Sequence, residues 1–218
     1  MTKQAKNHPS VPRVRYDEGC LGAHALNLVG DRWALLVVRE LVFATKRFGA
    51  IRAGLPGVTA SVLTGRLSQL EQAGVVTHDA QAGTYGLTDA GHGLLPVLQA
   101  LCRWALTVPG HDPRRFISPS ALMISMGVTL RAGPDASAGF DFGPEAFQMY
   151  LQSGALRTTA VQDPQAPFVL RGTGNAMAAA VYGPQPLAAL VASGVVQATG
   201  DLDRAQRFID QFSLQPRD

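Results

Sequence analysis

The sequence has few cysteines and no long apolar run. Its two cysteines, Cys20 and Cys102, are too few for a disulfide framework. No apolar stretch reaches the roughly 18 residues of a membrane-spanning helix, and the N-terminus lacks the apolar core of a signal peptide. We therefore expect a cytoplasmic protein in which each thiol has a role of its own.

Signs of an enzyme or of a metal protein are also absent. The five histidines are scattered, with no cysteine or carboxylate at metal-ligand spacing. There is no nucleophile elbow, and the sequence brings no Ser, His and Asp together. Gly172-Thr173-Gly174 resembles the start of a dinucleotide fingerprint, but Met177 stands where the third glycine belongs. The sequence thus predicts neither an enzyme nor a cofactor or metal site.

Basic residues are concentrated in the first half. Residues 1–109 contain three lysines and eight arginines against seven acidic residues, whereas the remainder contains eight arginines against nine acidic residues. Phosphate binding needs cations on one surface, so this asymmetry favours a nucleic-acid partner, with a solvated basic face as the alternative. Residues 1–19 predict a basic flexible arm that could follow a nucleic-acid backbone or act only as a solubilising tail; its cations are Lys3, Lys6, Arg13 and Arg15.

The segment from Thr45 to Val76 predicts two helices separated by a turn. Gly57 allows a tight bend, and the Thr59 hydroxyl can cap the second helix by accepting from its free amides. This helix could lie in the major groove of a duplex, or it could be an ordinary amphipathic helix. Its apolar face holds Leu63, Leu67, Leu70 and Gly74, and its slim polar face holds Ser61, Gly65, Ser68, Gln69 and Gln72.

The flanking segments favour the DNA-binding alternative. Val75 to Leu87 predicts a hairpin with a turn at Gly83, in the position of the wing in a winged helix-turn-helix. Two helices are expected upstream, across residues 26–33 and 34–41. A further helix is expected from Thr88 to about Val108.

Several blocks follow one another in a fixed order through residues 20–108. They are Cys20, Val29-Gly30-Asp31-Arg32-Trp33, Arg39-Glu40-Leu41, Arg47-Phe48-Gly49, Leu63-Thr64-Gly65-Arg66-Leu67 and Leu87-Thr88-Asp89-Ala90-Gly91. In this order they resemble the HxlR family of bacterial winged-helix regulators. The resemblance implies a homodimer that binds double-stranded operator DNA and regulates transcription. Leu21 departs from the family pattern, which usually has Pro after this cysteine.

The helix from Thr59 to Ala73 is expected to enter the major groove, with the hairpin touching the backbone or the minor groove. Arg66 could grip a phosphate or the O6/N7 edge of a guanine; the alternative is an intramolecular bridge to Glu40 or Glu71. The full predicted DNA-binding set is Lys46, Arg47, Arg52, Thr59, Ser61, Thr64, Gly65, Arg66 and Gln69, of which the first three are expected to hold phosphates.

The two cysteines have different expected roles. Cys20 lies at the head of the first helix, whose N-terminus would lower its pKa, whereas Asp17 and Glu18 would raise it. Some HxlR members sense oxidants or electrophiles through the cysteine at this motif position, so the resemblance makes Cys20 a candidate redox sensor; an inert, partly buried thiol is the alternative. For Cys102 we expect core or interface packing in a helix that could form a dimer seam. A Cys20–Cys102 bridge across the dimer is a further candidate.

The chain changes character after the Pro/Gly linker at residues 108–113. A helix is expected across residues 114–131. Strands are expected near 140–142, 146–151, 156–161, 167–170 and 195–199, and helices across 175–182, 186–192 and 201–212. This order, with Phe168 to Thr173 and Gly194 to Asp201, resembles the sterol carrier protein 2-like fold, which implies a sheet with helices over one face and an apolar tunnel for a lipid-like ligand.

The predicted fold class is α+β, with three parts. Residues 1–19 are the arm, residues 20–109 a winged helix-turn-helix domain for DNA binding and dimerisation, and residues 114–215 an SCP2-like α/β sandwich domain. An apolar small molecule bound there could bias a dimer between DNA-competent and incompetent states. A lipid carrier or enzyme that uses its first half only to dimerise is the remaining alternative. Ordinary core is the better default for the candidate pocket residues, which are Met123, Met126, Phe140, Phe142, Phe147, Met149 and Met177.

Overall fold

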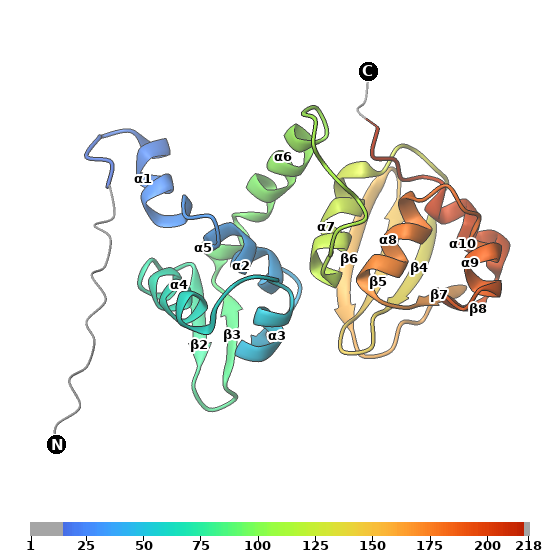
Figure 1. Cartoon of the computed structure of the whole chain (residues 1–218), viewed down its shortest axis with the longest axis horizontal. Coiled ribbons are helices and arrows are strands. Elements are labelled where there is room, and N and C mark those ends of the chain that lie inside the picture. The colour runs from blue at the N-terminus through green and yellow to red at the C-terminus, as the bar shows by residue number, and fades with distance from the viewer. Residues whose placement is uncertain (1–14, 216–218) are drawn as a thin grey trace.

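The computed structural model describes residues 15–215 and shows two domains side by side (Figure 1). The N-terminal domain consists of helices and a β-hairpin, whereas the C-terminal domain is a sheet with helices packed on it. The predicted arm cations Lys3, Lys6 and Arg13 lie outside the described residues. Within residues 15–215, none of the helices has the length and apolar character needed to cross a membrane.

The N-terminal domain has the element order of a winged helix-turn-helix. Its antiparallel sheet has the order β1-β3-β2, and the β2–β3 hairpin turns at Gly83, whose φ of +65° suits glycine. The predicted helix, turn, helix and hairpin are therefore all present. The elements are α1 (Leu21–Val29), α2 (Ala34–Leu41), β1 (Lys46–Arg47), α3 (Phe48–Ala53), α4 (Ala60–Gln72), β2 (Val76–Asp79), β3 (Thr84–Leu87), α5 (Asp89–His92) and α6 (Leu95–Ala105).

The helix predicted from Thr88 to about Val108 is interrupted. Thr88 caps α5 by accepting from the Gly91 amide at 3.1 Å, but α5 ends at His92. Pro96 then lies in the first turn of α6, where its missing N–H leaves no helical bond unmade. Because Pro cannot continue a preceding helix, two helices replace the predicted one.

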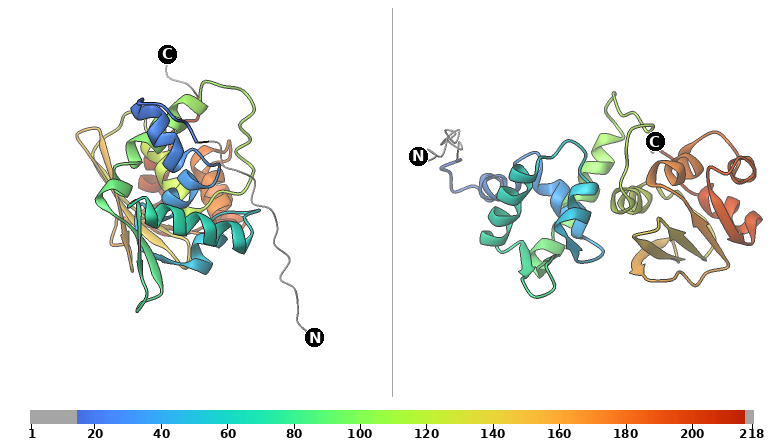
Figure 2. Two further views of the ribbon diagram at one scale, coloured as in Figure 1. Left: turned by 90° about the vertical axis from the view of Figure 1, so that its left-hand side faces the viewer. Right: turned by 60° about the horizontal axis from the view of Figure 1, so that its bottom comes forward.

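The C-terminal domain is built on a five-stranded sheet in the order β6-β5-β4-β7-β8. Strands β4 and β7 are parallel, and the other pairs are antiparallel. The helices pack on one face of this sheet (Figures 1 and 2). The elements are α7 (Pro119–Thr129), β4 (Ala136–Asp141), β5 (Ala146–Gln152), β6 (Ala155–Val161), β7 (Phe168–Arg171), α8 (Gly174–Tyr182), α9 (Leu187–Ala192), β8 (Gln197–Gly200) and α10 (Leu202–Ile209).

The first helix of this domain starts later than the sequence suggested. The Ser118 hydroxyl accepts from the Ala121 amide at 3.2 Å, and this cap fixes the start of α7 at Pro119. Ile124, on α7, is buried in the N-terminal core, whereas Met123 and Met126 are buried in the C-terminal core. Helix α7 therefore joins the two cores.

The structure contradicts the predicted pocket of Met and Phe side chains. Met126, Phe140, Met149 and Met177 are fully buried between the sheet and its helices. The Phe142 ring packs edge-on against Phe147, with 5.9 Å between the ring centroids. Apolar side chains that face one another close up to the density of a normal core unless something holds them apart. The seven predicted residues thus form core or its edge, namely Met123, Met126, Phe140, Phe142, Phe147, Met149 and Met177.

Candidate nucleic-acid interface

Helix α4 starts at a well-formed cap. The Thr59 hydroxyl accepts from the Val62 amide at 3.3 Å and lies 3.2 Å from the Ser61 hydroxyl. Gly57, two residues before the cap, has a φ of +87° and so permits the sharp turn that separates α3 from α4. The N-terminus of α4 is consequently fixed in place with its small polar side chains exposed.

The two faces of α4 differ sharply in size and polarity. Leu63, Leu67 and Leu70 are buried in the N-terminal core, as the sequence predicted. On the opposite side a Cβ added at Gly65 would meet no atom within 4 Å, so this position faces open space. A helix with such a shallow outer face can approach the floor of a groove closely. The exposed residues of this face are Thr59, Ser61, Thr64, Gly65 and Ser68.

Arg66 points to a neighbour within the domain. Its Nη2 lies 2.7 Å from Asp31 Oδ2, and its Nη1 donates to Gln69 Oε1 at 2.5 Å. The side chain is only 13% exposed. This is the intramolecular alternative that the sequence left open, although the partner is Asp31 rather than Glu40 or Glu71. The pair fastens α4 to the turn between α1 and α2, and a direct DNA contact by Arg66 stays a prediction.

Lys46 does not reach the surface. Its side chain is 5% exposed, and Nζ lies 3.3 Å from Glu40 Oε2 and 2.7 Å from Glu145 Oε2. It also donates to Ser120 Oγ at 3.1 Å. The prediction that Lys46 holds a DNA phosphate is contradicted, because its ammonium is enclosed by partners from both domains.

Glu40 is the centre of this buried ionic cluster. It is fully buried, and its Oε1 accepts from Ser118 Oγ at 2.6 Å and from Arg39 Nε at 2.9 Å. Gly54 must lack a side chain, because a Cβ there would lie 2.2 Å from Glu40 Oε2. Sequence reasoning missed this cluster, since Ser118 lies 78 residues from Glu40 and no local pattern connects them.

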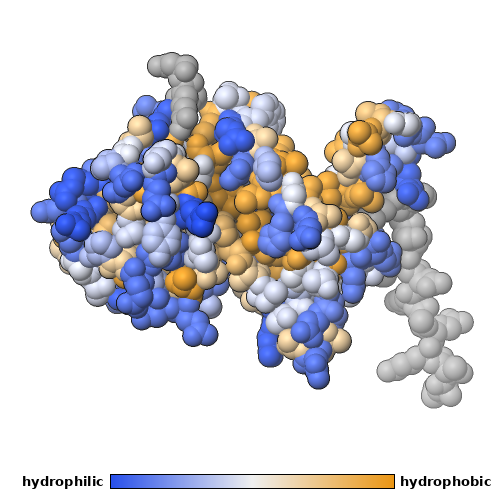
Figure 3. Space-filling model, turned by 180° about the vertical axis from the view of Figure 1, so that it is seen from behind, coloured by the Kyte–Doolittle hydropathy of each residue, from blue (hydrophilic) through white to orange (hydrophobic). Residues whose placement is uncertain are grey.

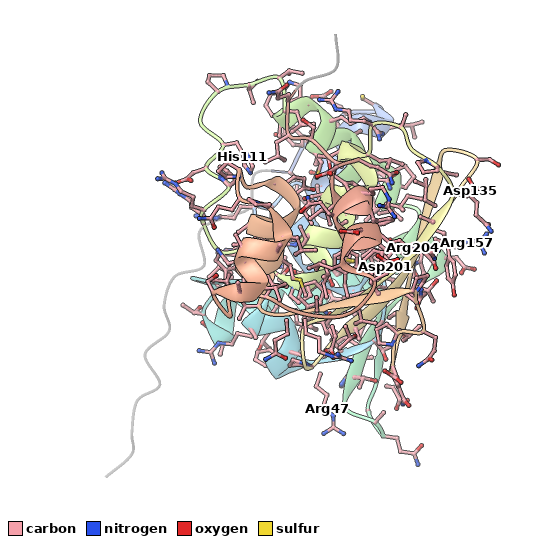
Figure 4. All side chains as sticks on the ribbon, turned by 90° about the vertical axis from the view of Figure 1, so that its right-hand side faces the viewer. Arg47, His111, Asp135, Arg157, Asp201 and Arg204 are labelled. Atoms are coloured by element: carbon pink, nitrogen blue, oxygen red, sulfur yellow. The ribbon has the colours of Figure 1, made fainter. Side chains whose placement is uncertain are left out.

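Of the three cations predicted to hold phosphates, Arg47 and Arg52 are exposed. Arg47 lies on β1, opposite Thr84 of the wing, and projects from the N-terminal domain (Figure 4). The wing itself contains no Lys or Arg between Val76 and Leu87. Phosphate contacts in this region therefore depend on Arg47 and Arg52 more than on the hairpin.

The tip of the wing carries a carboxylate. Asp79 Oδ1 accepts from the Gln81 amide at 2.9 Å and from the Ala82 amide at 3.0 Å. These two backbone hydrogen bonds lower the pKa of Asp79, so its negative charge is held at the tip. One residue pair below Asp79, the His78 and Tyr85 rings stack across the hairpin with 4.3 Å between centroids. A tip of this charge is unsuited to close approach to phosphates.

The two thiols lie in opposite environments. Cys20 is exposed at the N-terminus of α1, where the backbone amides of Ala23 and Gly22 lower its pKa. Cys102 lies half-buried on α6, and burial raises its pKa. The sequence left open whether the helix N-terminus or the nearby carboxylates control the pKa of Cys20, and the lowered pKa is the direction expected from the helix N-terminus. A Cys20–Cys102 bridge between two copies stays a prediction.

Comparison with known proteins places residues 28–111 in the family described as HxlR-like helix-turn-helix. The uncharacterized HTH-type transcriptional regulator YvaP of Bacillus subtilis is 38% identical over 86 residues, which span 37% of this chain and 80% of that protein. An uncharacterized HTH-type transcriptional regulator of Mycobacterium tuberculosis is 36% identical over 92 residues, spanning 40% of this chain and 58% of that protein, less than two thirds of its length.

Among solved structures, quinone-bound YodB from B. subtilis is 34% identical to this chain. The match covers 38% of this chain and 91% of that one, with a TM-score of 0.35. The similarity to YvaP extends over most of that protein, and the family match at residues 28–111 contains α4 and the wing. The chain therefore belongs to the HxlR-like helix-turn-helix family of DNA-binding transcriptional regulators.

Proposed function

We propose that this protein binds double-stranded operator DNA as a homodimer, with α4 of each protomer in the major groove. The observation that carries the proposal is the outer face of α4, which is small, polar and exposed behind a firmly capped N-terminus. The N-terminal residues of a recognition helix are the ones that reach base edges in such complexes. Thr59, Ser61 and Thr64 take that position here.

In the proposed complex, some residues contact DNA phosphates and others contact the edges of the bases. Arg47 and Arg52 are exposed and hold phosphates, which fixes the register but carries no sequence information. Gly65 allows the helix backbone to approach the bases, and Gln69 lies further along the same face. The pair with Asp31 supports a role for Arg66 in orienting α4, and a direct contact with DNA is the alternative that Asp31→Asn tests. The set comprises Arg47, Arg52, Thr59, Ser61, Thr64, Gly65 and Gln69.

The proposed dimer face lies on α1 and α6. Leu21 is 85% exposed and Trp104 is 63% exposed, and Leu26, Val97 and Leu101 are also exposed on these two helices. Apolar surface is visible across this side of the molecule (Figure 3). Large exposed apolar patches mark interaction surfaces, so we assign this one to a second copy of the chain.

The test is fluorescence anisotropy with the duplex upstream of the coding sequence and a scrambled duplex, at several salt concentrations. We expect preference for the native duplex and an affinity that falls steeply as salt rises, because phosphate contacts release counterions. Equal, weak binding to both duplexes would contradict operator recognition at this site. It would favour the alternative in which the first half only dimerises.

Cys20 supports a second proposal, an oxidant-sensitive response. The thiol is exposed, and two helix amides stabilise its thiolate, the form that reacts with oxidants. We expect mild oxidant to weaken operator binding by the wild type and to leave Cys20→Ser unaffected, as seen in a gel-shift dose series. Cys102→Ser is the matched control and should respond like the wild type. An identical response of wild type and Cys20→Ser would rule out sensing by Cys20.

For the C-terminal domain we propose an SCP2-like fold that serves as a ligand sensor. Its sheet, with helices on one face, agrees with that resemblance. Because the Met and Phe side chains are packed, a ligand has to bind elsewhere on the domain.

A further inference from the structure

A cavity of about 600 Å³ lies between the two domains. Trp33, the N-cap of α2, and Leu36, on α2, line one side, and Ala178 and Tyr182 line it from α8. The chain between α6 and α7 completes the wall with residues that include Phe116. Its volume is within the range of about 300 to 1,000 Å³ that is typical of small-molecule sites.

The cavity wall combines flat apolar surface with positive charge. Trp33, Phe116 and Tyr182 contribute aromatic rings. Among the described residues that line it, three are arginines and one is an acid, Asp112. This composition suits a ligand with an apolar ring and a negative charge.

Two of the lining arginines are available to a ligand. Arg32 is exposed and its guanidinium lies 4.9 Å from the Trp33 ring centroid, which places charge beside an aromatic surface. The Arg115 side chain is 86% exposed, and its Nε lies 3.9 Å from Asp112 Oδ2. Arg39 is instead held by Glu40 and by the Gly54 carbonyl, to which its Nη2 donates at 3.0 Å.

Asp112, the acid among the described lining residues, is already paired with a neighbouring arginine. Asp112 accepts from Arg114 Nε at 2.9 Å and from Arg114 Nη2 at 3.2 Å. This hydrogen bonding lowers the pKa of Asp112 to about 2. Arg114 thus makes the closest contacts of Asp112, and Arg115 Nε lies further away at 3.9 Å. The exposed guanidinium groups of Arg32 and Arg115 can therefore attract an anion.

We propose that this interdomain cavity binds a small aromatic carboxylate. The ring lies against Trp33, Phe116 and Tyr182, and the carboxylate is held by Arg32 and Arg115. The His111 side chain lies on the linker beside the cavity, on the side of the molecule opposite Arg157 (Figure 4).

Ligand binding at this place can reach the DNA-binding helix. Ser118 and Arg39 line the cavity, and both hydrogen-bond to Glu40, which belongs to the buried cluster that joins the domains. Leu55 and Pro56, in the turn before α4, also line it. A carboxylate that favours one arrangement of these elements changes operator affinity; this consequence rests on the proposed function, whereas the binding itself does not.

The experiment is isothermal calorimetry of the full-length protein without DNA. Three probes of nearly equal shape are compared: phenylbutyrate, neutral phenylbutanol and cationic phenylbutylamine. We expect saturable binding of phenylbutyrate with a Kd below about 1 mM and much weaker binding of the other two. Arg115→Gln should weaken phenylbutyrate binding about fivefold, the size expected for one exposed charge pair.

Arg157→Gln is the matched control, because Arg157 is an exposed arginine on β6, away from the cavity. We expect it to leave phenylbutyrate affinity unchanged. Equal loss in the two variants, equal binding of all three probes, or no binding below about 1 mM would each overturn the proposal. Because DNA is absent from the titration, its failure is distinguishable from a failure of operator binding.

A second readout localises the probe. The chain has two tryptophans, and Trp104→Phe leaves Trp33 as the only fluorophore of this kind. Phenylbutyrate should shift the Trp33 emission of this variant with the same Kd as calorimetry of the same variant gives. An unchanged emission alongside measurable heat would place the ligand elsewhere and overturn the proposal.

Discussion

Two carboxylates and a hydroxyl surround the Lys46 ammonium, at distances of 3.3 Å from Glu40, 2.7 Å from Glu145 and 3.1 Å from Ser120. Its neighbour Arg47 is exposed. Lys46 and Arg47 are adjacent on β1 but have different environments, because successive strand residues point to opposite faces. One side chain points to the interdomain cluster and the other to solvent.

This contrast makes a residue-scale prediction. Lys46→Ala should lower the free energy of unfolding by about 3 kcal/mol, because it removes the buried ammonium that pairs Glu40 with Glu145 and leaves Arg39 as the remaining cation beside Glu40. Arg47→Ala, the matched neighbour, should change stability by less than about 0.5 kcal/mol but weaken operator binding and reduce the salt slope by about 1. Urea unfolding and salt-dependent anisotropy measure the two effects. Equal stability of the two variants would contradict the role of the cluster.

At the scale of the element, the outer face of α4 is defined by what it lacks. Gly65 faces open space, and the other exposed side chains on this face are short. We predict that Gly65→Glu weakens operator binding at least about tenfold, because the added carboxylate meets DNA phosphates.

The control for this variant is Gly127→Glu. Gly127 is an exposed glycine within α7, where an added Cβ meets only Gln99 Nε2 at 3.8 Å. Both variants add one negative charge to a helix, so a difference in operator affinity between them reflects the position of the charge and not the net charge of the protein. Similar losses of operator affinity in both would exclude α4 as the recognition helix.

The Arg66–Asp31 pair permits a second element-scale test. We predict that Arg66→Ala weakens operator binding by at least ~1 kcal/mol, because α4 loses its attachment to the turn before α2. Asp31→Asn decides how Arg66 acts, since the amide oxygen can still accept from the Trp33 N–H while the charge is removed. Weaker binding of Asp31→Asn indicates that the pair orients α4. Unchanged or tighter binding indicates that Arg66 contacts DNA itself.

For the whole molecule, the apolar side chains of α1 and α6 determine the assembly we expect. Leu101 is 44% exposed on α6. Leu101→Glu should convert the dimer to monomers in sedimentation velocity and weaken operator binding, because a charge at a dimer seam is desolvated without a partner.

Val195→Glu provides the comparison at this scale. Val195 is 46% exposed, close to the value for Leu101, but precedes β8 in the C-terminal domain. It should leave the sedimentation coefficient unchanged. A wild-type protein that sediments as a monomer throughout would contradict the proposed assembly.

Local sequence signals are sufficient to predict most of the secondary structure around α4 and the wing in the N-terminal domain. The Thr59 cap, the ladder of Leu63, Leu67 and Leu70, and the hairpin at Gly83 all depend on residues a few positions apart. Capping, helical period and turn conformation act over such distances, so these elements were predicted from the chain alone. Pro96, in the first turn of α6, is likewise a local signal for the break between α5 and α6.

The environments of charged and apolar side chains could not be predicted in this way. Arg66 pairs with Asp31, 35 residues away, and Lys46 contacts Ser120, 74 residues away. Both contacts require two segments to be packed together first. The sequence likewise leaves open whether Met149 and Met177 line a pocket or fill a core. The packing of the helices on the sheet determines that they fill the core.

By itself, the sequence determined that a capped recognition helix, its wing and a second α/β region follow one another in this chain. Those features are set by local backbone preferences and by the alternation of apolar residues. The tertiary structure decided which cations face solvent, because burial and pairing depend on neighbours distant in the chain. It also decided that the space left for a ligand lies between the domains, since the linker, α2 and α8 meet only after folding.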